Sequence, residues 1–394
     1  MNDARPIYLD YAATTPVDEA VAAAMAHCLG RDGVYGNAAS LMHEPGRRAA
    51  AAVDAARAEL ATLLGARPEE LVFTSGATEA DNLAVIGAAR YFADRGRHLV
   101  TTRIEHKAVL DAARRLEREG WQVTWLEPDG EGRIDPASVA AALRDDTVLA
   151  AVMWVNNETG VVNDVEAIGR LCRERGVLFH VDAAQAVGKL AIDLARLPVD
   201  FLALTAHKFY GPKGVGALYI ADRPGVQVQP LLYGGGQERG LRPGTLPVHQ
   251  IVGLGAAAAR AREELPAERA RLTALRDRLS AGLTALDGVL VNGGGAVRIP
   301  GIVNVSVAGV DGESLFASLE PLAVASGSAC NTTSGEPSYV LRALGRDDRL
   351  AGASVRFSLG RYTTEDEVDR AVGIFAGAVD RLRRIAAPLG GRAA

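Results

Sequence analysis

One stretch joins an apolar run to a His-Lys pair and a glycine-rich turn: Phe201-Leu202-Ala203-Leu204-Thr205-Ala206-His207-Lys208-Phe209-Tyr210-Gly211-Pro212-Lys213-Gly214-Val215-Gly216. The apolar run predicts a strand that ends at Thr205. Lys208 would then lie just beyond the carboxyl end of a strand, where α/β sheets bind their ligands. A lysine in that place can condense with a carbonyl cofactor. The alternative is an ordinary solvated lysine, and this segment taken alone favours that alternative.

The bulk composition is typical of a soluble globular protein large enough for two domains. The chain has 394 residues, of which 48% are hydrophobic and 23% charged, and its net charge is −5. This charge gives no sign of direct nucleic-acid binding or of attraction to an anionic membrane. The sequence shows no signal-peptide pattern and no apolar stretch long enough to span a bilayer, so we expect a cytoplasmic protein.

The three cysteines are too few and too widely spaced for a disulfide framework or a metal-finger site. Cys172 lies in a helical pattern and Cys28 lies near a helix end, so we expect both to be structural. Cys330 differs, because residues 326–337 are nearly all small or turn-forming and predict an exposed loop. A thiol in such a loop is a candidate nucleophile.

Strands and helices alternate on the N-terminal side of Lys208. We predict strands over 71–74, 98–103, 122–126, 148–155 and 177–181. We predict helices over 46–64, from the turn 75–79 to about 94, and over 106–119, 135–143 and 164–175. This order predicts an α/β fold with a mostly parallel, doubly wound sheet. Polar residues that follow its strands should therefore meet at one edge, namely Asn157, Asp182, Gln185 and Lys208.

The C-terminal part reads as a smaller α+β domain. We predict one helix over 246–265, a break at Pro266 and a second helix to about 286. Strands follow near 289–291, 302–307, 322–325 and 354–359, with helices over 339–344 and 365–385. We therefore place a large domain over 16–265 and a small domain over 266–394, which carries the Cys330 loop (about 326–338). Residues 1–15 are expected to pack with the small domain.

Two helix starts could serve a cofactor. The turn 75–79 joins a strand to a helix, whose free backbone N–H groups would bind an anion, with Thr78 adding a hydroxyl. A plain turn in which Ser75 or Thr78 caps the helix is the alternative. His106 also begins a helix and could stack on a flat cofactor or shuttle protons, or it could simply cap that helix.

Two charged side chains could complete the site. A carboxylate such as Asp182 can pair with a protonated pyridine nitrogen and keep the ring an electron sink, although Asp182 could instead cap the next helix. Arg356 lies in an alternating strand with Ser354 and Ser358 on its own face. It could hold a substrate carboxylate through two parallel hydrogen bonds, or it could be an exposed strand arginine.

Taken together, these motifs resemble those of the cysteine desulfurases that feed iron–sulfur cluster assembly. These are fold-type I pyridoxal-phosphate enzymes related to the class V aminotransferases. The resemblance runs from Tyr8–Pro16 to Arg356–Arg361, and its other motifs are 74–79, 105–107, 155–158, 180–185, 207–208, 244–247 and 326–330. The long loop around Cys330 is similar to that of the housekeeping subgroup. The resemblance implies the PLP-dependent transferase fold type I and a homodimer.

The resemblance also implies a role for each matched residue. Lys208 would carry pyridoxal 5'-phosphate as a Schiff base, and Asp182 would pair with the pyridine nitrogen. Gln185 would bind the ring oxygen and His106 would stack on the ring. The phosphate would be held by Ala77, Thr78, Thr205 and His207, and by Thr245 of the second subunit.

The substrate implied by the resemblance is L-cysteine. Asn157 and Arg356 would grip its carboxylate, and Cys330 would take its sulfur as a persulfide and leave alanine. The acceptor would be an iron–sulfur scaffold protein or another carrier, including one for tRNA thiolation. Cys330 would share a [2Fe–2S] cluster with such a scaffold as a metal ligand. The longer C-terminal tail by which housekeeping enzymes hold the scaffold is not evident in residues 388–394, which argues against both expectations.

Two other activities use much of the same machinery. A selenocysteine lyase would differ only in the chalcogen that it accepts. An aminotransferase of small amino acids would need Lys208 and Asp182 but would have no use for Cys330.

Overall fold

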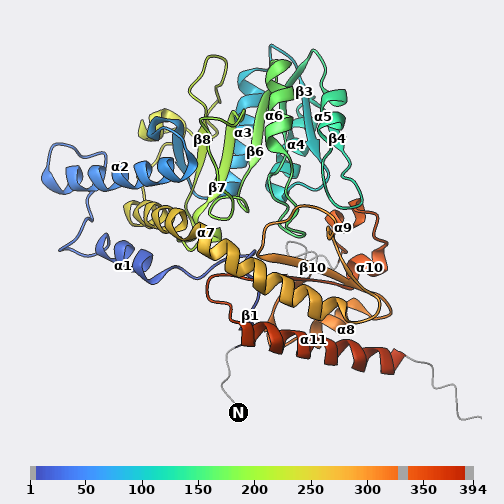
Figure 1. Cartoon of the computed structure of the whole chain (residues 1–394). Helices are drawn as coiled ribbons and strands as arrows, with labels where there is room; N and C mark the ends of the chain where they lie inside the picture. Colours follow the sequence, from blue (N-terminus) through green and yellow to red (C-terminus); the bar gives the residue numbers. More distant parts are fainter. Residues whose placement is uncertain (1–5, 327–335, 387–394) are drawn as a thin grey trace, which may run out of the picture.

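A computed structural model describes residues 6–326 and 336–386, and these contain a seven-stranded sheet, a four-stranded sheet and a two-stranded sheet (Figure 1). The large sheet has the order β2-β8-β7-β6-β5-β3-β4. Its strands are β2 (Leu71–Thr74), β3 (His98–Thr102), β4 (Gln122–Leu126), β5 (Thr147–Ala151), β6 (Leu178–Asp182), β7 (Phe201–Thr205) and β8 (Gly216–Ile220). Strand β8 runs opposite to the other six strands of this sheet and is antiparallel to both of its neighbours, β2 and β7. The predicted α/β fold with a mostly parallel sheet is confirmed.

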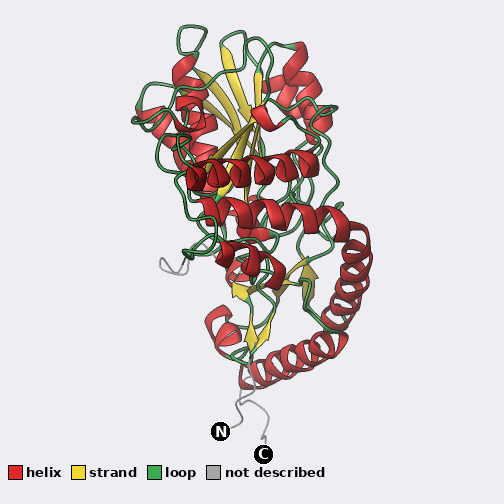
Figure 2. Ribbon diagram, turned by 90° about the vertical axis from the view of Figure 1, so that its left-hand side faces the viewer, coloured by secondary structure: helices red, strands yellow, loops and turns green. Residues whose placement is uncertain are grey.

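Helices lie on both sides of this sheet, as Figure 2 shows. They are α2 (Glu44–Leu64), α3 (Ala77–Tyr91), α4 (Lys107–Arg118), α5 (Pro136–Ala142) and α6 (Val165–Glu174). The start of α2 is capped by His43, whose Nδ1 accepts a hydrogen bond from Gly46 N, and the helix ends at Gly65 in the left-handed conformation (φ 62°). Short 3₁₀ turns follow as η1 (Pro68–Glu70), η2 (Ala206–Lys208) and η3 (Gln237–Gly240).

Two details of the large sheet differ from the prediction. The strand predicted over 148–155 ends at Ala151, because the chain beyond it leaves the regular ladder. There, Trp154 N donates to Asp182 O, and Val155 makes only an isolated bridge with Val162. Strand β8 and the helix α1 (Glu19–His27) were not predicted at all. The glycines and proline before β8 read as a plain loop.

The smaller sheet is antiparallel and has the order β12-β13-β10-β9. Its strands are β9 (Val289–Val291), β10 (Ile302–Val307), β12 (Ala325–Ser326) and β13 (Ser354–Ser358), and the helices near it are α8 (Gly312–Ala317), α9 (Tyr339–Ala343), α10 (Asp348–Gly352) and α11 (Glu365–Ala386). The N-terminal β1 (Ile7–Tyr8) pairs with β11 (Leu322–Ala323). Ile7 and Leu9 share a hydrophobic core with this sheet and α11.

A single long helix, α7 (Val248–Thr284), links the two parts of the molecule, so the predicted break at Pro266 is wrong (Figure 1). Leu254 and Ala258 are buried in the core of the large sheet, whereas Leu275 and Leu279 are buried in the core of the small one. Packing at both ends outweighs the cost of an internal proline, about 3 kcal/mol relative to alanine. Of the helices described, none has the length and apolar character needed to cross a membrane.

Candidate active site

The carboxyl ends of β6 and β7 open into a cavity of about 580 Å³. The predicted site residues that line it are Ala77, Thr78, His106, Asn157, Asp182, Gln185, Thr205, His207, Lys208 and Arg356. Thr245 is exposed and does not line the cavity. Cys330 lies outside the described residues.

Lys208 is held by the backbone of the N-terminal segment. It ends the short turn η2, directly after β7, and its Nζ donates hydrogen bonds to Ala12 O at 2.5 Å and Ala13 O at 2.7 Å. The alternative of a solvated lysine is therefore wrong. These two carbonyl groups present the amine at the wall of the cavity, where a carbonyl compound can reach it.

Asp182 is a buried carboxylate at the end of β6, with an exposed fraction of 5%. Its Oδ1 accepts a hydrogen bond from Ala184 N at 2.9 Å, so it does cap the turn that follows, and its side chain also lines the cavity. Burial raises the pKa of Asp182, while the nearby His106 and Lys208 act in the opposite direction. A cation bound beside this carboxylate would favour its ionised form.

The first turn of α3 forms another wall of the cavity. Gly76 is its N-cap and provides no side-chain cap, so the alternative of a cap from Ser75 or Thr78 is wrong. The backbone N–H groups at this helix start can bind an anion. A Cβ atom at Gly216 would lie 2.3 Å from Leu204 O and 2.7 Å from Gly76 Cα, so only glycine lets β8 pass this turn.

Two histidines lie at the same cavity. His207 Nδ1 lies 3.1 Å from Thr14 Oγ1, and desolvation, then Lys208 and Lys213, lower the pKa of His207 to about 4. This histidine is therefore neutral at pH 7. His106 is the N-cap of α4, because its Nδ1 accepts from Ala108 N at 3.2 Å. The capping alternative for His106 is correct, and the ring lines the cavity as well.

Arg356 is almost fully buried, with an exposed fraction of 2%, so the alternative of an exposed strand arginine is wrong. One terminal nitrogen lies 2.7 Å from Asp10 Oδ1 and the other donates to Asn157 O at 2.9 Å. Arg356 therefore contacts the N-terminal segment and the chain beyond β5 instead of water. Asn157 Oδ1 is buried and has no hydrogen-bond partner within the described ranges.

Sequence reasoning missed several groups at this site. Ala12 O accepts hydrogen bonds from both Lys208 and Gln185, the latter at 2.8 Å, and Lys213 is a further cation in the lining. The motif around Ala12 was part of the resemblance, but backbone carbonyls carry no side-chain signal. Lys213 could have been found from its place in the glycine-rich turn after Lys208.

The cavity fits pyridoxal phosphate by the chemistry of its donor groups. At one wall lie the uncapped start of α3, the hydroxyl groups of Thr78 and Thr205 and the neutral ring of His207. A carboxylate, Asp182, and an amine, Lys208, line the same space. An anion-binding helix start, a carboxylate and an amine match the phosphate, the ring nitrogen and the aldehyde of this cofactor.

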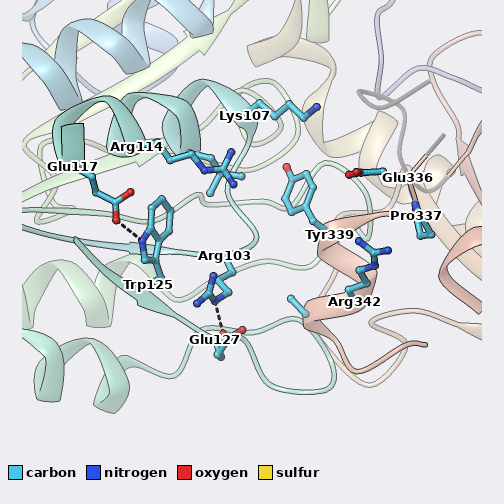
Figure 3. A pocket seen from close by; sticks show the side chains of 12 residues that line it. Arg103, Lys107, Arg114, Glu117, Trp125, Glu127, Glu336, Pro337, Tyr339 and Arg342 are labelled. Carbon is cyan, nitrogen blue, oxygen red and sulfur yellow. Dashed lines mark hydrogen bonds and ion pairs between the residues drawn. The ribbon is translucent and has the colours of Figure 1, made fainter. Parts of the chain in front are cut away.

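A second cavity, of about 560 Å³, lies between α4, β4 and α9 (Figure 3). It contains none of the predicted site residues. Its charged groups pair among themselves and with neighbours: Arg103 bonds to Glu127, and Arg342 lies 2.6 Å from Asp348. Glu117 accepts from the Trp125 indole at 3.1 Å. We assign no catalytic role to this cavity.

The two described cysteines and the acidic groups form no metal site. Cys28 and Cys172 are both buried, and burial raises the pKa of the Cys172 thiol to about 12. Within residues 6–326 and 336–386, no group of three or more His, Cys, Asp or Glu side chains could hold a metal ion.

Comparison with known proteins gives matches along nearly the whole chain. The family model for aminotransferase class-V matches residues 7–371. The chain is 55% identical over 378 residues to "Cysteine desulfurase IscS" of Pectobacterium atrosepticum, covering 96% of this chain and 94% of that protein. It is 56% identical over 380 residues to the protein of the same name from Pseudomonas putida, with the same coverage.

Solved structures agree with these sequence matches. A "NIFS-LIKE PROTEIN" superposes with a TM-score of 0.89 at 36% identity, covering 96% of this chain and 100% of that chain. A structure titled "SspA in complex with cysteine" gives a TM-score of 0.81 at 38% identity, with coverage of 91% and 99%.

Proposed function

Because the chain belongs to the aminotransferase class-V family and, within it, to the cysteine desulfurases, we propose that its large cavity removes sulfur from L-cysteine. The protein is a pyridoxal-phosphate-dependent cysteine desulfurase. The observation that carries the assignment to this cavity is that Lys208, Asp182 and Arg356 line one space. A reactive amine, a buried carboxylate and a carboxylate-binding arginine are what the chemistry needs.

The cofactor would be held by groups from three sides of the cavity. The start of α3, with Thr78, Thr205 and His207, would bind the phosphate, and Asp182 would pair with the ring nitrogen. Lys208 would attach the cofactor, His106 would stack on its ring and Gln185 would bind its ring oxygen. When bound, pyridoxal phosphate makes the α-hydrogen of an attached amino acid acidic.

Lys208 acts as the base in this proposal. With pyridoxal phosphate and cysteine bound, the Nζ amine would take the α-proton of cysteine and would later return a proton to the product. The carbonyl groups of Ala12 and Ala13, which now accept from Nζ, would orient the freed amine. Asp182 would pair with the ring nitrogen of the bound cofactor, whose positive charge would favour the ionised carboxylate.

Arg356 would hold the substrate carboxylate. Each terminal guanidinium nitrogen carries two hydrogens, so the bonds to Asp10 and Asn157 leave one on each nitrogen for a second acceptor. Asn157, whose Oδ1 has no hydrogen-bond partner among the described residues, lines the same cavity. Two parallel bonds from arginine would fix the orientation of the amino acid and favour an α-amino carboxylate over a simple amine.

Cys330 would take the sulfur. Its thiolate attacks the sulfur of bound cysteine, so that an S–S bond forms while the C–S bond breaks. The electron pair of that bond stays with the carbon, which gains a proton and leaves as alanine. Strand β12, which leads toward Cys330 in the sequence, pairs with β13 so that Ala325 lies opposite Arg356. This register supports the assignment, because Ser326, only four residues before Cys330 in the sequence, lies on the strand next to that of Arg356.

We further propose that the persulfide sulfur is passed on for iron–sulfur cluster assembly, to a scaffold protein or another sulfur carrier, by a cytoplasmic homodimer. Thr245 would reach the phosphate site of the partner subunit. Thr245 is exposed, and Met42 (95%) and Tyr233 (77%) are large hydrophobic side chains that are also exposed, which supports the binding of a protein partner. Residues 16–265 and 266–394 are proposed as the two domains, each built around one of the two cores.

The test is to give the cofactor-loaded protein L-cysteine and a reductant and to measure sulfide and alanine together. We expect equal amounts of both, and loss of both in Lys208→Ala and Cys330→Ala. Cys28→Ala is the matched thiol control and should keep the activity. Sulfide from Cys330→Ala at the native rate would contradict the role of that thiol. If the protein formed pyruvate from alanine and a second keto acid, and gave no sulfide from cysteine, it would be an aminotransferase instead.

A further inference from the structure

Lys189 lies one turn beyond Gln185 and contacts it directly. Its Nζ donates a hydrogen bond to Gln185 Oε1. Lys189 does not line the large cavity; it lines a separate cavity of about 40 Å³, which Lys208 also borders. The lysine therefore lies behind the proposed cofactor site and reaches it through the glutamine.

We propose that Lys189 is a positioning residue that fixes the Gln185 amide so that its nitrogen donates to the ring oxygen of the cofactor. This inference rests on the proposed function, because it requires pyridoxal phosphate in the large cavity beside Gln185.

The hydrogen-bonding capacity of each group determines the amide orientation. A lysine ammonium is only a donor, so the amide oxygen of Gln185 must face it. The amide nitrogen then faces Ala12 O, to which it donates at 2.8 Å. Rotating the amide by half a turn would set N–H groups against the ammonium and oxygen against a carbonyl, which creates two repulsive contacts. Lys189 and Ala12 thus require the same orientation.

This orientation leaves one amide hydrogen for the cofactor. The Gln185 nitrogen carries two hydrogens, and Ala12 O takes one of them. Gln185 is 3% exposed and lines the large cavity, so its second N–H is directed to an acceptor there instead of to bulk water. The ring oxygen of pyridoxal phosphate, which is anionic in the unprotonated state, is such an acceptor.

Charged groups of the proposed site act on the pKa of the Lys189 amine. Desolvation lowers its pKa to about 7, with Lys208 and Arg356 acting in the same direction and Glu268 opposing them. A protonated or a neutral amine can donate to Gln185 Oε1, although only the protonated form excludes the reversed amide. Lys189 therefore fixes the orientation of the Gln185 amide most strongly below pH 7.

The experiment compares the visible absorption of cofactor-loaded wild type, Lys189→Met, Gln185→Leu and the double variant across pH. A donor to the ring oxygen stabilises its anionic form and lowers the pKa of the bound cofactor. Each single variant should raise that pKa by about one unit, a tenfold change. The double variant should shift it no further than Gln185→Leu does, because Lys189 acts through the glutamine.

A second variant separates the hydrogen bond from the charge. Lys189→Gln can donate to Gln185 Oε1 without a positive charge, but its amide can also accept from a reversed Gln185 amide, so it should restore the wild-type titration only in part. Additive shifts in the double variant, or an unchanged titration in Lys189→Met, would overturn the proposal. A wild-type protein that shows no visible band with pyridoxal phosphate would instead overturn the proposed function. Thermal unfolding of each variant shows that the comparison is between folded proteins.

Discussion

Glu105 Oε1 accepts a hydrogen bond from Met153 N at 2.8 Å and thereby ties the segment before α4 to a residue of the cavity wall. The same oxygen accepts from Thr102 Oγ1 at 2.8 Å. Its second oxygen is buried and has no hydrogen-bond partner in the part of the chain that the structure describes. Burial is the main cause that raises the pKa of Glu105 from 4.5 to about 8.

Glu105 should make the stability of the cofactor-free protein depend on pH. Because its folded pKa lies above its unfolded value, its contribution is fully present below pH 4.5 and is lost as pH rises to about 8. The loss is at most about 1.4 kcal/mol per pH unit. In urea unfolding, the free energy of unfolding of Glu105→Gln should fall less between pH 4.5 and about 8 than that of the wild type. The exposed Glu174→Gln serves as control, and an equal slope in Glu105→Gln would contradict the assignment.

Gly216→Ala should weaken cofactor binding. The new Cβ would press on Leu204 O and on Gly76, and so displace the anion-binding start of α3. We expect the dissociation constant for pyridoxal phosphate, measured by titration of the apoprotein, to rise about tenfold. This rise corresponds to a loss of about 1.4 kcal/mol of binding free energy.

The matched control for this change is Gly377→Ala in α11, where a Cβ would meet nothing within 4 Å. That substitution should stabilise the protein by about 0.5–1 kcal/mol, because alanine favours helix more than glycine does. Unchanged cofactor affinity in Gly216→Ala would show that the turn tolerates a wider separation from β8.

The parallel sheet and the meeting of its strand ends could be predicted because both depend on local patterns. The strands of the large sheet before Lys208 contain apolar and β-branched residues, and parallel strands bring their carboxyl ends to one edge. Asp182 and Lys208 therefore meet at one cavity, as their sequence positions indicated.

Contacts between distant segments could not be read in this way. Pro266 breaks a helix locally, but cores at both ends of α7 hold it together, and no nearby residue reports this. The alternation of β13 left open whether Arg356 is exposed or faces a site, and the structure shows it buried and paired with Asp10, far away in sequence. A further contact, from Lys189 to Gln185, is local but was not predicted either. The two residues are four apart and lie outside every described helix, so their spacing alone does not indicate that the side chains meet.

Arg361→Met should destabilise the junction between α7 and the segment before α11. The guanidinium lies 2.9 Å from Asp18, 3.0 Å from Glu264 and 3.2 Å from Glu268, and its side chain is 13% exposed. Its removal leaves these carboxylates repelling one another, which should cost about 2–4 kcal/mol of unfolding free energy. Arg278→Met, which breaks an exposed pair with Asp369, should cost less than about 1 kcal/mol. Equal losses in the two variants, measured by urea unfolding, would contradict this difference.

Arg356→Lys should weaken the binding of L-cysteine through its carboxylate. Lysine keeps the charge but cannot make two parallel hydrogen bonds, so the KM for L-cysteine should rise about 10- to 100-fold, the equivalent of about 1.4–3 kcal/mol. Cysteamine, which lacks the carboxylate, separates this effect from general damage to the site. Its spectral titration of the bound cofactor should give the same dissociation constant in the wild type and in Arg356→Lys. If both ligands lost affinity equally, Arg356 would act by holding Asp10 and the Asn157 backbone in place, and the carboxylate would have another partner.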